Sequence, residues 1–400
     1  MSPAPVSLHD SPGITNLVLE DARFAYEHTS FSTLNSEGIS IAAEVLNDVM
    51  IRQEYSPNVW RSEPLHLIPP PWIRSAEDPL ARPTLDWIFL VSALNFSFWS
   101  EYEGSEKRFA VDWRTSWDPD SPEKSWDGYY SLLAALNRAL EEGIPITDPS
   151  FYASETSCPD SLIEYVFRKS SESVEDMPLL QERIRVMREV GSILCERFGG
   201  SFQEFIVGYI KRFGKERDAI DAVKMVVDTF PAFRDQTTFK GRQIRFWKRP
   251  QILIAETWVA FYPVEPGIPH PIFPKGVKGL TMFADYRVPQ ILNQLQMLSY
   301  DEDLIRVLQS HQYVESGSEM EISIRASSIL AVEALKTEII RIRKLEAIEN
   351  GSTSHPASEI TSVILDFFLW DLAKQVERGE VRLRAYTESN PAHRIRCIWY

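Results

Sequence analysis

Cysteine is scarce in this chain of 400 residues, which contains only Cys158, Cys195 and Cys397. Their odd number and wide separation fit neither a disulfide framework nor the spacing of a zinc site. The seven histidines are scattered as well, and none stands in ligand spacing with another histidine or a cysteine. We therefore expect a reduced, cytoplasmic protein without a metal site.

Long apolar runs and a secretory signal are also missing. The longest apolar stretch, Trp87 to Trp99, is about a third too short to span a bilayer and contains Asn95 and Ser97. The N-terminus MSPAPVSLHDSPG has no cationic segment followed by an apolar core, so it is not typical of a signal peptide. We expect no membrane association and interpret residues 1–14 as a flexible tail.

Positive charge is in deficit, with 42 Lys and Arg against 57 Asp and Glu and a formal net charge of -15. Such a chain is poorly suited to lie along nucleic acid or an anionic membrane, because both repel an acidic protein. A small anionic ligand remains compatible, since a few Lys or Arg side chains can hold one phosphate. We expect no stable complex with nucleic acid.

Familiar catalytic motifs are absent too. The sequence contains no GxxxxGK(S/T) or GxGxxG phosphate loop, no GxSxG nucleophile elbow and no HExxH zinc motif. Any functional site must therefore use carboxylates, aromatic side chains and a few cations.

Apolar residues that recur with the period of a helix are the strongest positive signal. They predict helices at residues 39–52, 85–98, 129–141, 179–198, 217–230, 291–298, 303–309, 326–349 and 360–376. Gly199 and Gly200 are expected to end the fourth helix, and Ser299 with Glu302 to cap the seventh. Strand patterns are few and short, at residues 108–113 and 243–247.

The predicted fold class is therefore mainly α. We expect a single large helical domain over residues 15–400, with a few short strands, acting as a monomer. Surface loops are expected at residues 64–83, 118–127 and 263–278, where prolines, glycines or acidic residues gather.

Two segments combine carboxylates with aromatic residues. TMFADYRVPQ contains Phe283 and Asp285, and ILDFFLWD contains Asp366, Phe367 and Asp371. An unpaired charge in an apolar run such as ILDFFLWD costs free energy or shifts its pKa. Asp366 and Asp371 differ by about 140° in direction around a helix, so one could point at a pocket floor and the other at its rim.

The aspartates also have structural interpretations. Asp285 is expected to form a local ion pair or a turn with Arg287, and Asp371 to be a solvated helix residue near Lys374. For Asp366 the structural and the functional interpretation stand equal, since its neighbours are large and apolar.

Three further positions carry an ionisable group of interest. His66 in EPLHLIPPPW is interpreted as a loop histidine. Lys248 and Arg249 are interpreted as a solvated charged pair, with phosphate binding as the alternative.

Seven segments follow one another between residue 85 and the C-terminus in a recognisable order: LDWIFLVSALNFSFWS (85–100), DGYYSLLAALNRALEEGIPIT (127–147), ERFGGSF (196–202), TFPAFRD (229–235), TMFADYRVPQIL (281–292), ILDFFLWD (364–371) and HRIRCIWY (393–400). Together they resemble the queuosine salvage protein family, the queuosine 5'-phosphate N-glycosidases. The resemblance implies hydrolysis of the N-glycosidic bond of queuosine 5'-phosphate, with release of queuine for reuse in transfer RNA modification. It also implies a helical fold similar to base-excision DNA glycosylases, and neither a metal nor an organic cofactor.

The resemblance also implies roles for individual residues. By motif, the catalytic carboxylate falls on Asp366. Base-binding roles fall on residues of the two aromatic segments, and a ligand-binding histidine matches the proline-rich stretch: Phe283, Asp285, Phe367, Asp371 and His66. Position 367 is commonly Tyr in relatives, so ring stacking would persist here without a phenolic hydroxyl.

The chemistry of the implied reaction suits these residue types. Cleavage builds positive charge on the ribose, which an ionised Asp366 would stabilise. The 7-deazaguanine base has carbon in place of N7 and cannot be protonated there. Asp285 and Asp371 suit its N1 and amine protons and its cationic secondary amine, while Phe283 and Phe367 can stack on the ring.

Under this interpretation Lys248 and Arg249 are candidates to bind the 5'-phosphate. Two other functions stay open: a non-catalytic protein that binds queuine or another nucleobase, and a DNA or RNA base glycosylase. A glycosylase of polymers requires a basic face, which the acidic composition disfavours.

Overall fold

The computed structural model describes residues 16–265, 267–350, 360–381 and 390–400. The chain divides into two compact units. The first comprises Met1–Ser56, Asp235–Lys248 and Val277–Ile395, and the second comprises Pro57–Arg234, Arg249–Gly276 and Arg396–Tyr400. The single-domain organisation stays a prediction, and the tail expected at residues 1–14 lies outside the described residues.

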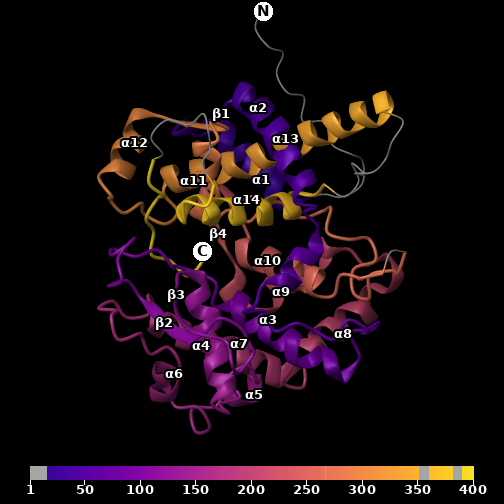
Figure 1. The fold of residues 1–400 in the computed structure, drawn as a ribbon, viewed down its shortest axis with the longest axis vertical. Helices are drawn as coiled ribbons and strands as arrows, with labels where there is room; N and C mark the ends of the chain where they lie inside the picture. Colours follow the sequence, from indigo (N-terminus) through magenta and orange to yellow (C-terminus); the bar gives the residue numbers. More distant parts are fainter. Residues whose placement is uncertain (1–15, 266, 351–359, 382–389) are drawn as a thin grey trace, which may run out of the picture. The chain divides into compact units, whose positions relative to one another are not determined.

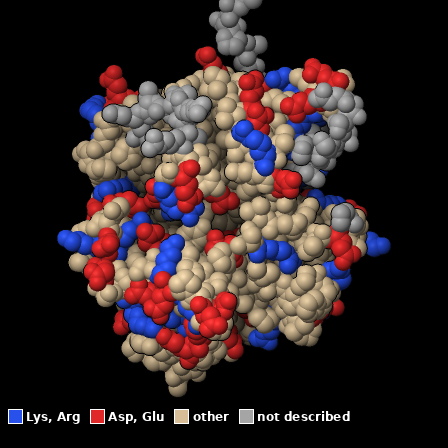
Figure 2. Space-filling view, in the orientation of Figure 1, with Lys and Arg blue, Asp and Glu red and all other residues tan. Residues whose placement is uncertain are grey.

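Helices dominate both units, as the sequence predicts, and the strands form only short antiparallel pairs (Figure 1). None of the helices in the described part of the chain has the length and apolar character that a membrane span needs. Acidic and basic side chains of the described residues are interspersed on the face that Figure 2 shows.

The first unit is organised around the long helix α13, Glu319–Asn350. The elements that pack against it come from both ends of the chain: α1 (Leu17–Glu27), β1 (Ser32–Leu34), α2 (Ser36–Arg52), α11 (Arg287–Gln294), β6 (Leu298–Tyr300) and α14 (Ser362–Glu377). Small side chains on α13 permit this close approach. Ser323 and Ser327, both buried, form hydrogen bonds of 3.0 and 2.7 Å to Ser32 of β1.

Two strand pairs and one short helix complete the first unit. β1 pairs with β6, and β4 (Gln236–Phe239) forms a hairpin with β5 (Arg242–Arg245). Asp21 on α1 anchors this hairpin, because its buried carboxylate pairs with Arg242 at 2.9 Å and Arg245 at 2.7 Å. The short helix is α12, Glu302–Gln309.

The second unit has a helical core. Its elements are η1 (Pro57–Ser62), η2 (Pro79–Ala81), α3 (Arg82–Ala93), β2 (Ala110–Arg114), β3 (Glu123–Asp127), α4 (Tyr129–Glu141), α5 (Pro149–Tyr152), α6 (Asp160–Val166), α7 (Leu180–Arg197), α8 (Phe202–Phe213), η3 (Gly214–Glu216), α9 (Ala219–Thr229), η4 (Pro231–Phe233) and most of α10 (Lys248–Ala260). Phe89 of α3 packs in a cluster of aromatic rings with Phe202, Phe230 and Phe233. Asp86, also on α3, accepts the Phe202 N–H at 2.7 Å and thereby fixes the start of α8.

One helix end and one loop predicted in the second unit are wrong. α3 ends at Ala93 and not at residue 98, because the Arg183 guanidinium binds the carbonyls of Leu94 and Phe96, and Ser97 is left-handed with φ 58°. The loop expected at residues 118–127 is partly a strand, since Glu123–Asp127 pairs with β2.

Two predictions in the first unit are also corrected. α11 begins at Arg287, four residues before the predicted start at 291, because Asp285 accepts the N–H groups of its first turn. The cap of α12 is Asp301, whose carboxylate accepts the Leu304 N–H at 2.8 Å, and not the predicted pair of Ser299 and Glu302.

The end of α7 was predicted correctly, whereas several helices were not predicted. Gly199 and Gly200 end α7 as predicted, both with positive φ, and the Gly200 N–H binds the Leu194 carbonyl. Helices α1, α5, α6, α8 and α10 were not predicted. Gly208 inside α8 and Pro250 at the start of α10 weaken the helical pattern there.

Candidate active site

Asp366 lies near the start of α14, in its second turn, and is buried at 5% exposure. The Phe283 N–H donates to its Oδ1 at 2.8 Å, and among the described residues this is the hydrogen bond that Asp366 accepts. Burial raises the pKa of Asp366 well above its usual range, and the nearby Asp285 and Asp371 raise it further. The apolar neighbours in ILDFFLWD thus create a carboxylate that is costly to ionise.

Lys248 opposes this cost. Its charge favours the ionised form of both Asp366 and Asp285, so it lowers the pKa of each against the effect of burial. Lys248 is itself only 4% exposed. The expectation that it is a solvated surface charge is therefore wrong, and the first unit places this lysine beside two carboxylates.

Asp285 is oriented by the helix that follows it. Its Oδ1 accepts the N–H groups of Arg287 and Val288, both at 2.9 Å, at the positive end of α11. Desolvation raises the pKa of Asp285, while Lys248 and these N–H groups lower it. The turn-forming interpretation of Asp285 is confirmed, whereas Arg287 forms an ion pair with Glu377 at 3.4 Å. Capping occupies one carboxylate oxygen and does not exclude a ligand at the other.

The two candidate stacking residues meet in the first unit. The rings of Phe283 and Phe367 lie 5.8 Å apart at 61°, an edge-to-face contact. Phe283 is buried, whereas Phe367 is partly exposed and can present one face of its ring. This pairing places an aromatic surface next to Asp366, which directly precedes Phe367 in α14.

Asp371 has a partner that the sequence analysis missed. The Tyr55 hydroxyl donates to Asp371 Oδ2 at 2.8 Å, and the Tyr55 ring packs edge-on against Phe368 at 5.0 Å. Burial and the charge of Asp371 raise the pKa of Tyr55 well above its usual range, so the phenol stays protonated and keeps donating. Lys374, the expected neighbour of Asp371, forms an ion pair with Glu377 at 2.8 Å.

No local signal could have revealed Tyr55. It follows α2, 316 positions before Asp371. The chain turns back there because Glu54 is left-handed with φ 49° and the Tyr55 N–H binds the Met50 carbonyl at 3.0 Å. Its role therefore depends on the packing of both ends of the chain.

His66 belongs to the second unit, where it is buried between aromatic rings. Trp60 stacks on the imidazole at 4.1 Å, and Trp87 meets it edge-on at 5.8 Å. Burial lowers the pKa of His66 to about 4, so the ring is neutral at pH 7. Its Nδ1 lies 2.8 Å from the Trp60 carbonyl. A carbonyl only accepts, so Nδ1 carries the proton and Nε2 is an acceptor.

Arg249 is fully buried in the second unit and supports its fold. Its two terminal nitrogens donate to the carbonyls of Ala93 and Ala232, and its guanidinium lies over the rings of Phe96 and Phe233 at 5.1 Å each. The expectation of a solvated charge is wrong for Arg249 as well.

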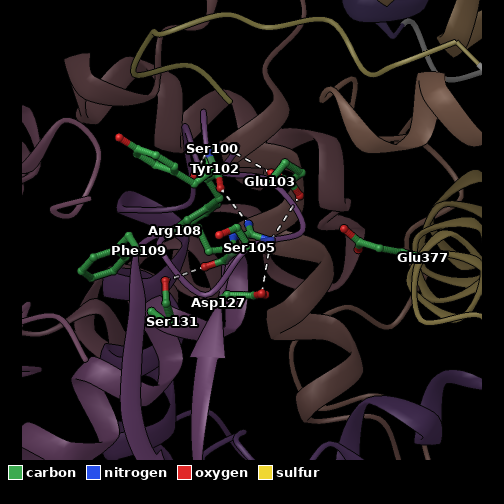
Figure 3. Close-up of polar contacts among 12 residues, drawn as sticks. Ser100, Tyr102, Glu103, Ser105, Arg108, Phe109, Asp127, Ser131 and Glu377 are labelled. Carbon is green, nitrogen blue, oxygen red and sulfur yellow. Dashed lines mark hydrogen bonds and ion pairs between the residues drawn. The ribbon is translucent and has the colours of Figure 1, made fainter. Parts of the chain in front are cut away.

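A separate polar cluster surrounds Arg108 in the second unit (Figure 3). Arg108 Nη1 lies 3.2 Å from both Glu103 and Asp127, and a small cavity beside it is lined by Ser131 and Glu175, among others. The charges of this cluster pair with one another, which is typical of a structural network.

The first unit thus brings together Asp285, Asp366, Asp371 and Lys248, with Phe283 and Phe367 beside them. Across the described residues, no group of three or more His, Cys, Asp or Glu side chains is arranged to hold a metal ion. The arrangement suits a flat ligand that carries positive charge or develops it, because buried carboxylates stabilise such charge strongly.

Comparisons with known proteins agree with this chemistry. The family model described as "Queuosine salvage protein" matches residues 75–400. Three relatives are named "Queuosine 5'-phosphate N-glycosylase/hydrolase". The one from Mus musculus is 38% identical over 95% of this chain and 98% of its own length. The one from Schizosaccharomyces pombe is 36% identical over 96% of this chain and 99% of its own.

The third relative comes from the bacterium Sphaerobacter thermophilus and is 34% identical over 83% of this chain and 86% of its own length. The family model matches most of the chain, and the first two relatives are covered over nearly their whole length. The chain belongs to the queuosine salvage protein family.

Proposed function

We propose that this chain hydrolyses the N-glycosidic bond of queuosine 5'-phosphate and releases queuine and ribose 5-phosphate. The names of its relatives supply the substrate. The observation that carries the mechanism is the buried Asp366 carboxylate, held by the Phe283 N–H beside Asp285 and Lys248. The enzyme salvages queuine in the cytoplasm as a monomer, without a cofactor and without stable nucleic-acid binding.

The proposed fold relationship is to base-excision DNA glycosylases. The mainly helical architecture of both units supports it. The substrate is nevertheless a free mononucleotide, since the net charge of -15 opposes binding along a polyanion.

Asp366 is the proposed catalytic residue. As the bond from C1' to the base breaks, positive charge develops on the ribose, and the ionised carboxylate stabilises it. Oδ1 is held by Phe283, so Oδ2 is available to the sugar. A water oxygen bonds to C1', and the electrons of the broken bond leave with the base, which takes up a proton. The low local dielectric around Asp366 strengthens the stabilisation.

The base is recognised by the other two aspartates. Asp285 presents its second carboxylate oxygen to the N1 and amine protons of the 7-deazaguanine. Asp371, which is partly exposed and held by Tyr55, binds the cationic secondary amine. Phe283 and Phe367 stack on the ring. His66 stays a proposed ligand-binding residue, since its neutral Nε2 can accept a hydrogen bond.

Lys248 has two proposed tasks. It compensates the charges of Asp366 and Asp285 in the empty site, and it binds the 5'-phosphate of the substrate. Arg249 is the second phosphate candidate from the sequence. Because its terminal nitrogens bind two backbone carbonyls, we assign the phosphate to Lys248.

The first prediction concerns catalysis. Asp366→Asn is expected to lower kcat on queuosine 5'-phosphate by at least about 100-fold, because the neutral amide cannot stabilise the charged ribose. Chromatography of released queuine measures this. Asp86→Asn, which alters a buried carboxylate of the second unit, serves as a control and should keep its kcat. Full activity of Asp366→Asn would rule out the catalytic role, and tight queuine binding by the wild type without turnover would favour a binding protein.

The second prediction concerns stability. The pKa of Asp366 is raised in the folded protein, so ionising it costs folding free energy increasingly as pH rises above the unfolded value of about 4. Asp366→Asn removes this cost. Its Tm relative to the wild type should therefore increase from pH 5 to pH 8, as measured by thermal unfolding without ligand. A difference in Tm that stays constant or falls over this range would contradict the prediction.

The third prediction separates the base-binding aspartates. Asp371→Asn is expected to weaken queuine binding by about 10- to 100-fold, the value of a charge-assisted hydrogen bond, and to leave the affinity for neutral 7-deazaguanine nearly unchanged. Asp285→Asn should weaken both. Titration calorimetry with the two bases measures the effects. If Asp371→Asn weakened the binding of both bases equally, Asp371 would not be the residue that binds the secondary amine of queuine.

The fourth prediction concerns the phosphate. Lys248→Met is expected to reduce the preference in kcat/KM for queuosine 5'-phosphate over queuosine by about tenfold or more. Lys248→Arg keeps the charge and should retain most of the preference. Assays of both substrates with each variant provide the ratio, and an unchanged ratio in Lys248→Met would exclude phosphate binding by this residue.

A further inference from the structure

Asp235 organises the turn that leads into Lys248. Its backbone carbonyl accepts the N–H groups of Phe246 at 3.1 Å and Trp247 at 3.2 Å. Its carboxylate Oδ2 accepts the N–H of Lys248 at 3.0 Å. Three consecutive N–H groups thus bind one residue, which is itself buried.

This turn contains a strained residue. Trp247 is left-handed with φ 48°, a conformation that a bulky side chain rarely adopts. Such a conformation persists only where the surrounding contacts hold it. The direction in which Lys248 leaves the turn therefore depends on Asp235.

Arg325 on α13 fixes Asp235. Its two terminal nitrogens donate to the two carboxylate oxygens of Asp235 at 2.9 and 2.6 Å, a bidentate pair. The guanidinium lies 4.0 Å from the centre of the Phe246 ring, and Glu321 contributes a further contact at 3.4 Å. Arg325 is 1% exposed, so water does not compete for these bonds.

The third guanidinium nitrogen of Arg325, Nε, reaches the catalytic segment. Its Nε donates to the Ala284 carbonyl at 3.0 Å. Ala284 stands between Phe283, whose N–H holds Asp366, and Asp285, which caps α11. One guanidinium therefore joins the turn of Lys248 to the segment that carries the carboxylates.

We propose that Asp235 and Arg325 are positioning residues, which fix Lys248 relative to the segment Phe283–Asp285 and thereby to Asp366. The proposal rests on the glycosidase function proposed above. A buried ion pair is a weak means of stabilising a fold, because apolar residues of similar size often do as well. The pair forms fixed hydrogen bonds to the turn of Lys248 and to the segment Phe283–Asp285, so it can hold the distance between these two segments.

The pKa of Asp366 depends on the position of Lys248 and therefore reports whether the ion pair holds this lysine in place. The ionisable groups that interact with it in the first unit are Asp285, Asp371, Tyr55 and Lys248. Lys248 favours the ionised carboxylate, and the two aspartates oppose it. If the ion pair loosens and Lys248 moves away, the pKa of Asp366 rises, and a higher pH is needed to ionise it.

The test uses two variants that conserve charge but change the geometry of the pair. Arg325→Lys loses the bidentate fork, and Asp235→Glu shifts the carboxylate by one methylene. We expect kcat on queuosine 5'-phosphate to fall at least about tenfold with a smaller change in KM, and the acidic limb of the kcat profile to move up by about half a pH unit or more. Asp301→Ala is the control. It removes the side-chain cap of α12 in the same unit and should lose stability without moving the acidic limb of the kcat profile.

A second readout needs no turnover. The Tm gain of Asp366→Asn over its parent should begin at the same pH in both backgrounds, but in the Arg325→Lys background it should keep rising to a higher pH and reach a larger value than in the wild type. If Arg325→Lys and Asp235→Glu lost stability while the acidic limb of kcat and the pH dependence of the Tm gain stayed unchanged, the ion pair would have only a structural role. That result would overturn the proposal. If the wild-type protein releases no queuine, the proposed function fails, while this thermal comparison still tests the positioning.

Discussion

The desolvation of the Asp366 carboxylate is the constraint on which the site depends. Large apolar neighbours on α14 exclude water and raise its pKa, which makes the ionised form costly in the empty protein. The same environment gives that charge its strength against a developing cation. The features around Asp366 reflect this balance: a backbone N–H from Phe283, a buried Lys248, and two further carboxylates that raise the energy of the empty site.

Each carboxylate is oriented by a different structural device. A backbone N–H of the loop before α11 binds Asp366, the first turn of α11 binds Asp285, and the phenol of Tyr55, which follows α2, binds Asp371. Residues held in this way lose little further freedom when a ligand arrives. Arg325 extends the principle, because its guanidinium contacts the segments of Lys248 and Asp285 at once. The site is thus assembled from the start, the middle and the end of the chain.

The helices were the most predictable part of the fold. α4 was predicted at residues 129–141 and occupies Tyr129–Glu141, since its apolar face is continuous and Gly128 precedes it. α11 and the cap of α12 were misplaced, because side chains of Asp285 and Asp301 decide where those helices begin. Composition could not reveal that Lys248 and Arg249 are buried, since adjacent cations are more often solvated.

The sequence by itself determined the local helices, through the 3.6-residue period of its apolar positions, and it marked ILDFFLWD and TMFADYRVPQ as segments with chemistry to explain. The tertiary structure decided which charges meet. Tyr55 reaches Asp371 across 316 positions, and Arg325 reaches Asp235 across 90. The physical reason is that the free energy of a buried charge depends on every group packed around it, and those groups come from elements far apart in the chain.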